Sequence, residues 1–182
     1  MPDYRRAGIS GGTYFFTVNT FRRQTLLIED RVRHALRAGI ESTRRAHPFS
    51  VEAWVLLPDH LHCIWRLPPG NADFSVRWAM IKRYVTKQCA SGLAGSRLSE
   101  SRQKRNERGF WQRRFWEHAI RDEADFRAHV DYIHWNPVKH GYVKQAKDWP
   151  YSTFHRFVAK GIYPEAWGGI DDTMMDERRY GE

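Results

Sequence analysis

One nine-residue stretch constrains the fold more than any other part of the chain. Residues 57–65 read Leu-Pro-Asp-His-Leu-His-Cys-Ile-Trp, in which two histidines alternate with apolar residues. Because side chains in a strand alternate between faces, His60 and His62 project from one face, and Leu61 and Cys63 project from the other. The pattern therefore predicts a strand with an apolar face toward the core and two imidazoles side by side on the opposite face. Two such ring nitrogens form half of a divalent-metal site, although unconnected strand histidines would show the same spacing.

The balance of charge indicates a polyanionic partner. The 182 residues include 30 Lys and Arg against 21 Asp and Glu, a formal net charge of +9. Aromatic residues make up 14% of the chain. We expect most of these rings to fill the core, but rings interleaved with arginines are also typical of surfaces that stack unpaired bases. Nucleic acid is therefore the expected partner. A membrane is the weaker alternative, because the sequence has no apolar run long enough to cross a bilayer.

The length of the chain suits one domain with a well-buried core, and no linker separates two such cores. We expect residues 1–150 to form this domain, with a basic N-terminal arm, and residues 151–182 to form a tail of the same domain. The two cysteines, Cys63 and Cys89, give neither a disulfide framework nor zinc-finger spacing, which favours a reducing cytoplasm. The first residues lack the apolar core of a signal peptide, so secretion is not expected.

Hydrophobic periodicity and turn residues predict alternating strands and helices. The expected elements are a strand at 13–19, a helix at 30–46, strands at 49–57 and 60–67, a helix at 74–88, a strand at 115–120, and a last helix capped by Asp122 and ended by Pro137. This order is that of an α+β, ferredoxin-like split βαβ fold, in which an antiparallel sheet carries helices on one side and a C-terminal tail follows.

The last predicted helix carries a candidate nucleophile. Tyr132 and Asn136 are four residues apart and share a helix face, so a phenol and an amide oxygen point the same way. Over the histidine face of the sheet they would meet the two imidazoles. Tyr84, with Gln88 four residues later, offers the same spacing, but its basic neighbours favour a face that contacts a nucleic-acid backbone. Asn136 precedes Pro137 and could instead be a helix C-cap, and Tyr132 could be a half-buried helix tyrosine.

Two motifs resemble one known family. Residues 58–65 and residues 130–141, Val-Asp-Tyr-Ile-His-Trp-Asn-Pro-Val-Lys-His-Gly, closely resemble the REP-associated tyrosine transposases, which are single-tyrosine members of the HUH nucleases. The resemblance extends through residues 11–19, 110–118 and 148–155, so it covers nearly the whole chain. It implies the HUH endonuclease fold.

The resemblance also implies an activity. Members of the family are Mg²⁺- or Mn²⁺-dependent single-strand DNA endonucleases and strand transferases that act at palindromic repeats, folded as hairpins, in bacterial chromosomes. By the family motif, His60, His62 and Asn136 are metal ligands, and Tyr132 is the nucleophile that forms a 5′-phosphotyrosine. The expected location is the bacterial cytoplasm, at the nucleoid. The resemblance implies neither a membrane partner nor a small-molecule substrate, and it fixes no oligomeric state.

Two points stay open at the level of sequence. No dedicated general base is evident, and His129 and His134 are the candidates. A repeat-binding protein or repressor with the same fold but no cleavage is the alternative function, although the presence of every motif residue argues against it. A zinc-dependent hydrolase of small molecules would need a further His, Glu or Cys ligand and would leave the positive charge unexplained.

Basic residues in the N-terminal arm, on the second helix and in the loop before the last strand are expected to contact DNA. The expected set is Tyr4, Arg5, Arg6, Arg83, Lys87, Arg102, Lys104, Arg105, Arg108, Arg113 and Arg114. Each charge taken alone could be an ordinary solvated side chain. Backbone contacts of this kind position a hairpin, while a few unpaired nucleotides beside it carry the sequence information.

Overall fold

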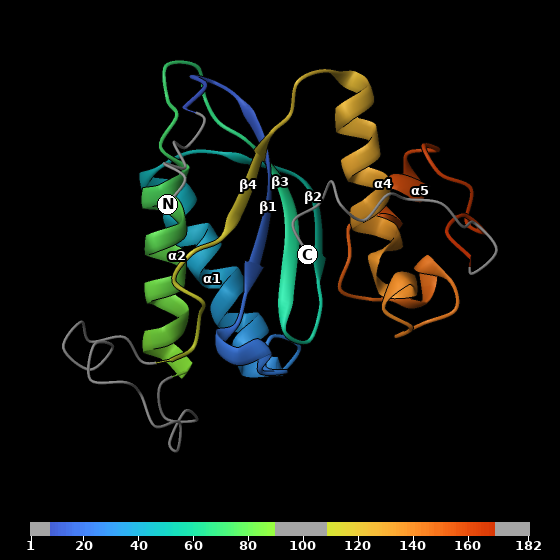
Figure 1. The fold of residues 1–182 in the computed structure, drawn as a ribbon, viewed down its shortest axis with the longest axis horizontal. Helices are drawn as coiled ribbons and strands as arrows, with labels where there is room; N and C mark the ends of the chain where they lie inside the picture. The colour runs from blue at the N-terminus through green and yellow to red at the C-terminus, as the bar shows by residue number, and fades with distance from the viewer. Residues whose placement is uncertain (1–7, 90–108, 170–182) are drawn as a thin grey trace, which may run out of the picture.

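A four-stranded antiparallel sheet organises the protein (Figure 1). The computed structural model describes residues 8–89 and 109–169. Its strands are β1 (Thr13–Asn19), β2 (Ser50–Leu56), β3 (His60–Arg66) and β4 (Trp116–Ala119), in the order β2-β3-β1-β4. Its helices are α1 (Asp30–Ala46), α2 (Phe74–Cys89), α4 (Glu123–Lys139) and α5 (Phe154–Ala159), with short 3-10 turns η1 (Phe21–Arg23) and η3 (Ala146–Asp148).

The alternating strand β3 lies at the centre of this sheet, between β2 and β1. Its apolar side chains, Leu61, Cys63 and Trp65, are fully buried in the core that α1 and α2 complete. The Trp65 ring stacks on Trp78 of α2, with ring centroids 4.2 Å apart. The two helices approach closely at Gly39, where an added Cβ would lie 3.2 Å from the Tyr84 ring. This face of β3 therefore packs the sheet against α1 and α2.

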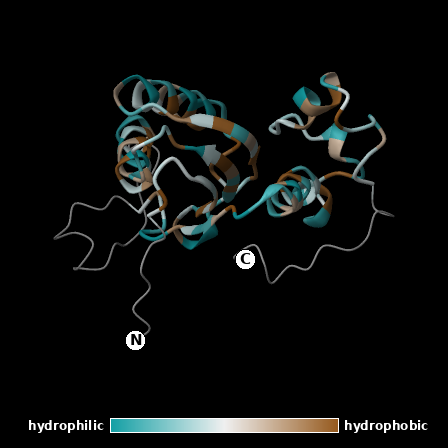
Figure 2. Cartoon of the chain, turned by 90° about the horizontal axis from the view of Figure 1, so that it is seen from above, coloured by the Kyte–Doolittle hydropathy of each residue, from teal (hydrophilic) through white to brown (hydrophobic). Residues whose placement is uncertain are grey.

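The opposite face of the sheet is covered by α4. Phe15 of β1 and Ile64 of β3 form a second apolar core with Val130 and Ile133 of α4. Figure 2, viewed from above, shows α1 and α2 on one side of the sheet and α4 and α5 on the other. The sequence prediction of an α+β, split βαβ antiparallel fold is confirmed by this strand order. The expectation of helices on one side holds for α1 and α2, whereas α4 packs on the histidine face because its apolar stripe needs a second surface to bury.

The helix α4 does not end at Pro137, as the sequence predicted, but continues to Lys139. A proline removes only the hydrogen bond from its own nitrogen, which here lies in the last turn. The backbone N–H of His140 still donates to Asn136 at 3.0 Å, and that of Tyr142 donates to the Pro137 carbonyl at 3.0 Å. The predicted cap at the other end is confirmed, since the Asp122 carboxylate accepts from the Asp125 N–H.

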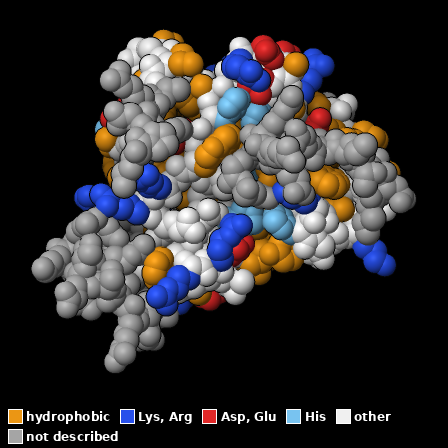
Figure 3. All heavy atoms as spheres, viewed as in Figure 1, with side chains coloured by type: hydrophobic (Ala, Val, Ile, Leu, Met, Phe, Trp, Pro, Cys, Tyr) orange, Lys and Arg blue, Asp and Glu red, His pale blue; other side chains and the backbone are white. Residues whose placement is uncertain are grey.

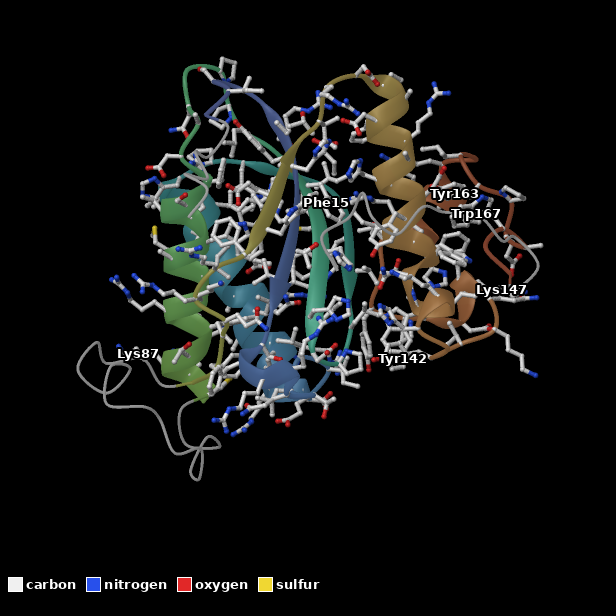
Figure 4. All side chains as sticks on the ribbon, viewed as in Figure 1. Phe15, Lys87, Tyr142, Lys147, Tyr163 and Trp167 are labelled. Carbon is white, nitrogen blue, oxygen red and sulfur yellow. The ribbon has the colours of Figure 1, made fainter. Side chains whose placement is uncertain are left out.

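The described part of the predicted tail, residues 151–169, packs against α4. Figure 4 shows Tyr163 and Trp167 beside this helix, and their rings stack with centroids 4.3 Å apart. The Tyr163 hydroxyl donates to the Asp131 carboxylate. Among residues 8–89 and 109–169, no helix has both the length and the apolar character needed to cross a bilayer.

His134, a candidate general base in the sequence, lies on the side of α4 that faces this segment. It is fully buried, its Nε2 lies 2.9 Å from Thr153 Oγ1, and its ring packs on Phe157. Burial, with a smaller effect of the Arg156 charge, lowers the pKa of His134 to about 3. This side chain is a neutral core residue.

The buried His134 predicts a loss of stability in acid. Below about pH 6.5 the unfolded chain takes up a proton at this residue that the folded chain cannot take up, so folding weakens as the pH falls. From pH 7 to pH 5, the free energy of unfolding of His134→Gln should fall by about 2 kcal/mol less than that of the original protein. Urea titrations at both pH values measure this difference. His155→Gln, at an exposed position, is the control, and equal losses in all three proteins would show that His134 is not the titrating group.

Candidate active site

The strand β3 places His60 and His62 together on the face covered by α4. Their ring centroids are 4.9 Å apart, with the planes nearly perpendicular. Both side chains are buried, with 1% and 0% of their surface exposed. The sequence predicted this pairing from the alternation of the strand, and the structure shows it.

Neighbouring side chains form a hydrogen bond with Nδ1 of each ring. His60 Nδ1 donates to Asp59 Oδ1 at 2.6 Å, and His62 Nδ1 lies 2.9 Å from Thr17 Oγ1. Although burial opposes ionisation, the hydrogen bond from His60 lowers the pKa of Asp59. Arg23 Nε lies 3.4 Å from the other carboxylate oxygen. Such partners fix the orientation of a ligating imidazole, and Nε2 is then the atom that each ring offers to a metal.

Tyr132 lies directly against this histidine pair. Its ring centroid is 5.3 Å from that of His62, and the side chain is fully buried. Lys139 Nζ donates to the Tyr132 hydroxyl at 3.2 Å, from two turns along the same helix. An ammonium at this distance stabilises negative charge that develops on the phenol oxygen. The predicted nucleophile is thus next to the predicted ligands.

Asn136 lies in the chain midway between Tyr132 and His140, and both of these residues contact the histidine pair. Four residues before it, Tyr132 packs on His62, and four residues after it, the His140 ring lies 5.2 Å from the His60 ring. Residues four apart share a helix face. Asn136 is fully buried, and its position in the helix lies on the face that meets the two imidazoles.

Two other sequence candidates lie elsewhere. Tyr84 is on α2, on the other side of the sheet, where it packs against Gly39 of α1. His129 is on α4 but packs on Phe15, with ring centroids 4.8 Å apart, and its Nδ1 donates to the Asp125 carbonyl. The structure therefore separates the rival tyrosine from the histidine pair.

The expected DNA-contacting residues are only partly within the described chain. Tyr4, Arg5 and Arg6, and Arg102, Lys104, Arg105 and Arg108, lie outside the described residues. Arg83 and Lys87 are exposed on α2, across the sheet from the histidine pair, and Figure 4 shows Lys87 directed away from the sheet. Arg113 and Arg114 are exposed just before β4. Figure 3 shows basic and histidine side chains interspersed on the face viewed there.

Several residues of the site did not stand out in the sequence. Thr17 meets His62 only because the two are cross-strand partners in β1 and β3. Asp59 was predicted only as a turn residue, although a carboxylate next to a candidate ligand is itself a signal. Lys139 reaches the Tyr132 hydroxyl across seven positions, beyond the usual three or four of helix neighbours.

Comparisons with known proteins identify the family. No family model matches the chain. The chain is 50% identical to the REP-associated tyrosine transposase of Escherichia coli (strain K12) over 179 residues, which cover 98% of each chain. It is 44% identical to a putative REP-associated tyrosine transposase of Haemophilus influenzae over 175 residues, 96% of this chain and 98% of that one.

A solved structure indicates the same family as these two relatives. The fold matches that of a REP-associated tyrosine transposase bound to a REP hairpin, with a TM-score of 0.81 and 50% identity, over 100% of this chain and 98% of that one. Identity at this level over nearly the whole length shows common descent, and the chain belongs to the REP-associated tyrosine transposases.

Proposed function

We propose that this protein is a metal-dependent single-strand DNA endonuclease and strand transferase that cuts beside hairpins of repetitive extragenic palindromes. The observation that carries the proposal is the packing of a buried tyrosine, Tyr132, against His62 of a paired-histidine strand. Membership of the family supports the substrate class, since a relative with 50% identity is bound to a REP hairpin.

The donor atoms fit a divalent ion. His60 and His62 would each offer Nε2, because Asp59 and Thr17 hold the other nitrogens, and Asn136 would add an amide oxygen. Two nitrogen donors suit Mn²⁺ better than Mg²⁺, which prefers oxygen ligands, and both ions accept water in the remaining positions. When bound, the ion withdraws charge from the scissile phosphate and stabilises the departing 3′-oxygen.

The chain itself supplies and positions the nucleophile. The Tyr132 ring is fixed between His62 and Phe15, whose ring centroids lie 5.3 Å and 6.1 Å from its own. Its oxygen attacks the phosphorus and forms a 5′-phosphotyrosine, while the bond from phosphorus to the 3′-oxygen breaks and leaves a 3′-hydroxyl. Lys139 stabilises the phenolate that forms as the phenol proton leaves. Since the phosphodiester energy is kept in the covalent link, a second 3′-hydroxyl can reverse the step and join strands without ATP.

Lys139 provides a prediction on catalysis. Lys139→Met removes the ammonium from the Tyr132 hydroxyl, and single-turnover cleavage should slow by about 10²-fold. DNA affinity should change only a few-fold, because one charge among many contacts is lost. Lys144→Met, at an exposed lysine five residues later, should leave the rate unchanged. Equal rates for Lys139→Met and Lys144→Met would remove Lys139 from the mechanism.

The proposed activity is tested by following both ends of the cut strand. The protein is incubated with Mn²⁺ and a REP hairpin with single-stranded flanks, labelled either at the 5′ end or at the 3′ end, and then denatured. A 5′-phosphotyrosine mechanism releases a shorter free strand that keeps the 5′ label and leaves the 3′ label attached to protein. Retarded hairpin in native gels with no adduct for either label would support the alternative, a non-cleaving repeat-binding protein or repressor.

A further inference from the structure

A second group of metal-binding residue types lies on the same face of the sheet. It consists of His118 on β4 and of Asp125 and His129 on α4. The Phe15 ring lies between this group and the histidine pair, with centroid distances of 4.8 Å to His129 and 5.4 Å to His62. The group is therefore separate from the histidine pair.

The fold brings the three side chains together from two elements. In the sheet, His118 lies opposite Phe15 of β1 and so faces α4. Asp125 and His129 are four residues apart, near the start of α4, and share the face that meets β4. The His118 and His129 rings stack with centroids 4.6 Å apart and planes within 13°.

Their donor atoms are spaced like metal ligands. One donor atom from each residue lies within 4.8 Å of the others. Asp125 Oδ2 is 2.8 Å from His118 Nε2, and Asp125 Oδ1 is 3.2 Å from His129 Nδ1. Bonds of about 2.0 Å to a tetrahedral zinc ion separate its ligand atoms by about 3.3 Å. Both carboxylate–imidazole distances are therefore close to that spacing, and the 25% exposure of the His118 side chain leaves a side for a water ligand.

The protonation states also suit a metal. Although burial opposes ionisation, hydrogen bonds from His118 and Arg121 hold the pKa of Asp125 well below its usual range. Burial lowers the pKa of His129. An ionised carboxylate and a neutral imidazole are the forms that bind metal ions. To bind through Nδ1, His129 would move its proton to Nε2 and give up the hydrogen bond that Nδ1 now donates to the Asp125 carbonyl.

We propose that His118, Asp125 and His129 form a second site, for a divalent transition metal of the zinc type, which ties β4 to the first turns of α4. Two imidazoles and one carboxylate select zinc, cobalt or nickel over magnesium. Because α4 carries Tyr132, an ion here would fix the helix that presents the nucleophile without touching the reacting atoms.

Arg121 competes with the ion for the same carboxylate. Its Nε lies 3.2 Å from Asp125 Oδ2, although 72% of its side chain is exposed. Removing this guanidinium would take away one hydrogen-bond donor to this oxygen, which also accepts from the Arg121 backbone N–H at 3.0 Å, and would remove a positive charge next to the site. The proposal therefore requires Arg121→Gln to bind zinc more tightly, by about tenfold, which a purely structural role for the cluster would not produce.

Binding is measured directly, by equilibrium dialysis of the chelator-treated protein against Zn²⁺ with elemental analysis. We expect two zinc ions per chain in the original protein and one in His60→Ala/His62→Ala, which removes the first pair. Adding His118→Gln to that variant should abolish binding, and adding His155→Ala, at an exposed position, should not. Co²⁺ in the double variant should give the visible absorption of a tetrahedral centre.

A stability measurement checks the same site independently. In the His60→Ala/His62→Ala protein, saturating Zn²⁺ should raise Tm by about 5–10 °C, and the added His118→Gln change should cancel this rise. Circular dichroism without metal verifies that each variant folds. The proposal is wrong if the His60→Ala/His62→Ala protein binds no zinc. It is also wrong if adding Arg121→Gln, a change at an exposed side chain, leaves the zinc affinity of that protein unchanged.

Discussion

Tyr132→Phe should abolish covalent attachment of the protein to DNA, with a loss of at least about 10³-fold. The substitution removes one oxygen from a ring that is otherwise held by Phe15 and His62. Hairpin binding should stay within a few-fold, since it rests on cationic and stacking contacts away from this oxygen. Denaturing gels measure the adduct, and native gels measure binding.

Tyr84→Phe is the matched control for this change. Tyr84 is the rival that the sequence offered, and it lies across the sheet against Gly39. We expect its substitution to leave attachment at the level of the original protein. Loss of the adduct in Tyr84→Phe together with its retention in Tyr132→Phe would reverse the assignment of the nucleophile.

His62→Ala should remove divalent-ion-dependent cleavage, because the proposed site then keeps a single imidazole. His60→Ala should have the same effect, whereas Asn136→Ala should be milder, since a neutral amide contributes less to binding a cation. Asp59→Asn should weaken the ion's affinity by about 10–100-fold, because it alters the group that orients His60. Cleavage rates over a Mn²⁺ titration separate lost affinity from lost chemistry.

An exposed histidine on α5 provides the control for these variants. His155→Ala, at an exposed position on α5, should keep the rate and Mn²⁺ dependence of the original protein. Full cleavage by His62→Ala in EDTA would contradict a metal site at the histidine pair.

The parts of the fold that follow from local pattern could be predicted from the sequence. Alternation in β3 indicated both its buried face and its histidine face, and the order of strands and helices indicated the split βαβ sheet. The four-residue spacing of Tyr132 and Asn136 also indicated a shared helix face, and the Tyr132 ring lies next to His62. Each of these rests on periodicity within an element or on the order of elements along the chain.

Two of the features that the sequence missed depend on where separate elements meet, and a third depends on hydrogen bonds at the end of a helix. The contact of Thr17 with His62 requires the register between two strands distant in the chain. Only the approach of β4 to α4 brings His118 to Asp125. The continuation of α4 through Pro137 depends on hydrogen bonds beyond the proline, whereas the local preference of proline indicated a helix end. The contacts of Thr17 and His118 are long-range, and such contacts leave no periodic pattern in the sequence.

Peptide mapping of the covalent adduct tests the central claim most directly. After reaction with Mn²⁺ and a REP hairpin, nuclease and trypsin digestion should leave a 5′-linked nucleotide on the peptide 128–139, in which Tyr132 is the one tyrosine. Mass spectrometry then places the added phosphate on that residue. A nucleotide on the peptide 84–87, which contains Tyr84, or on any other tyrosine would contradict the account.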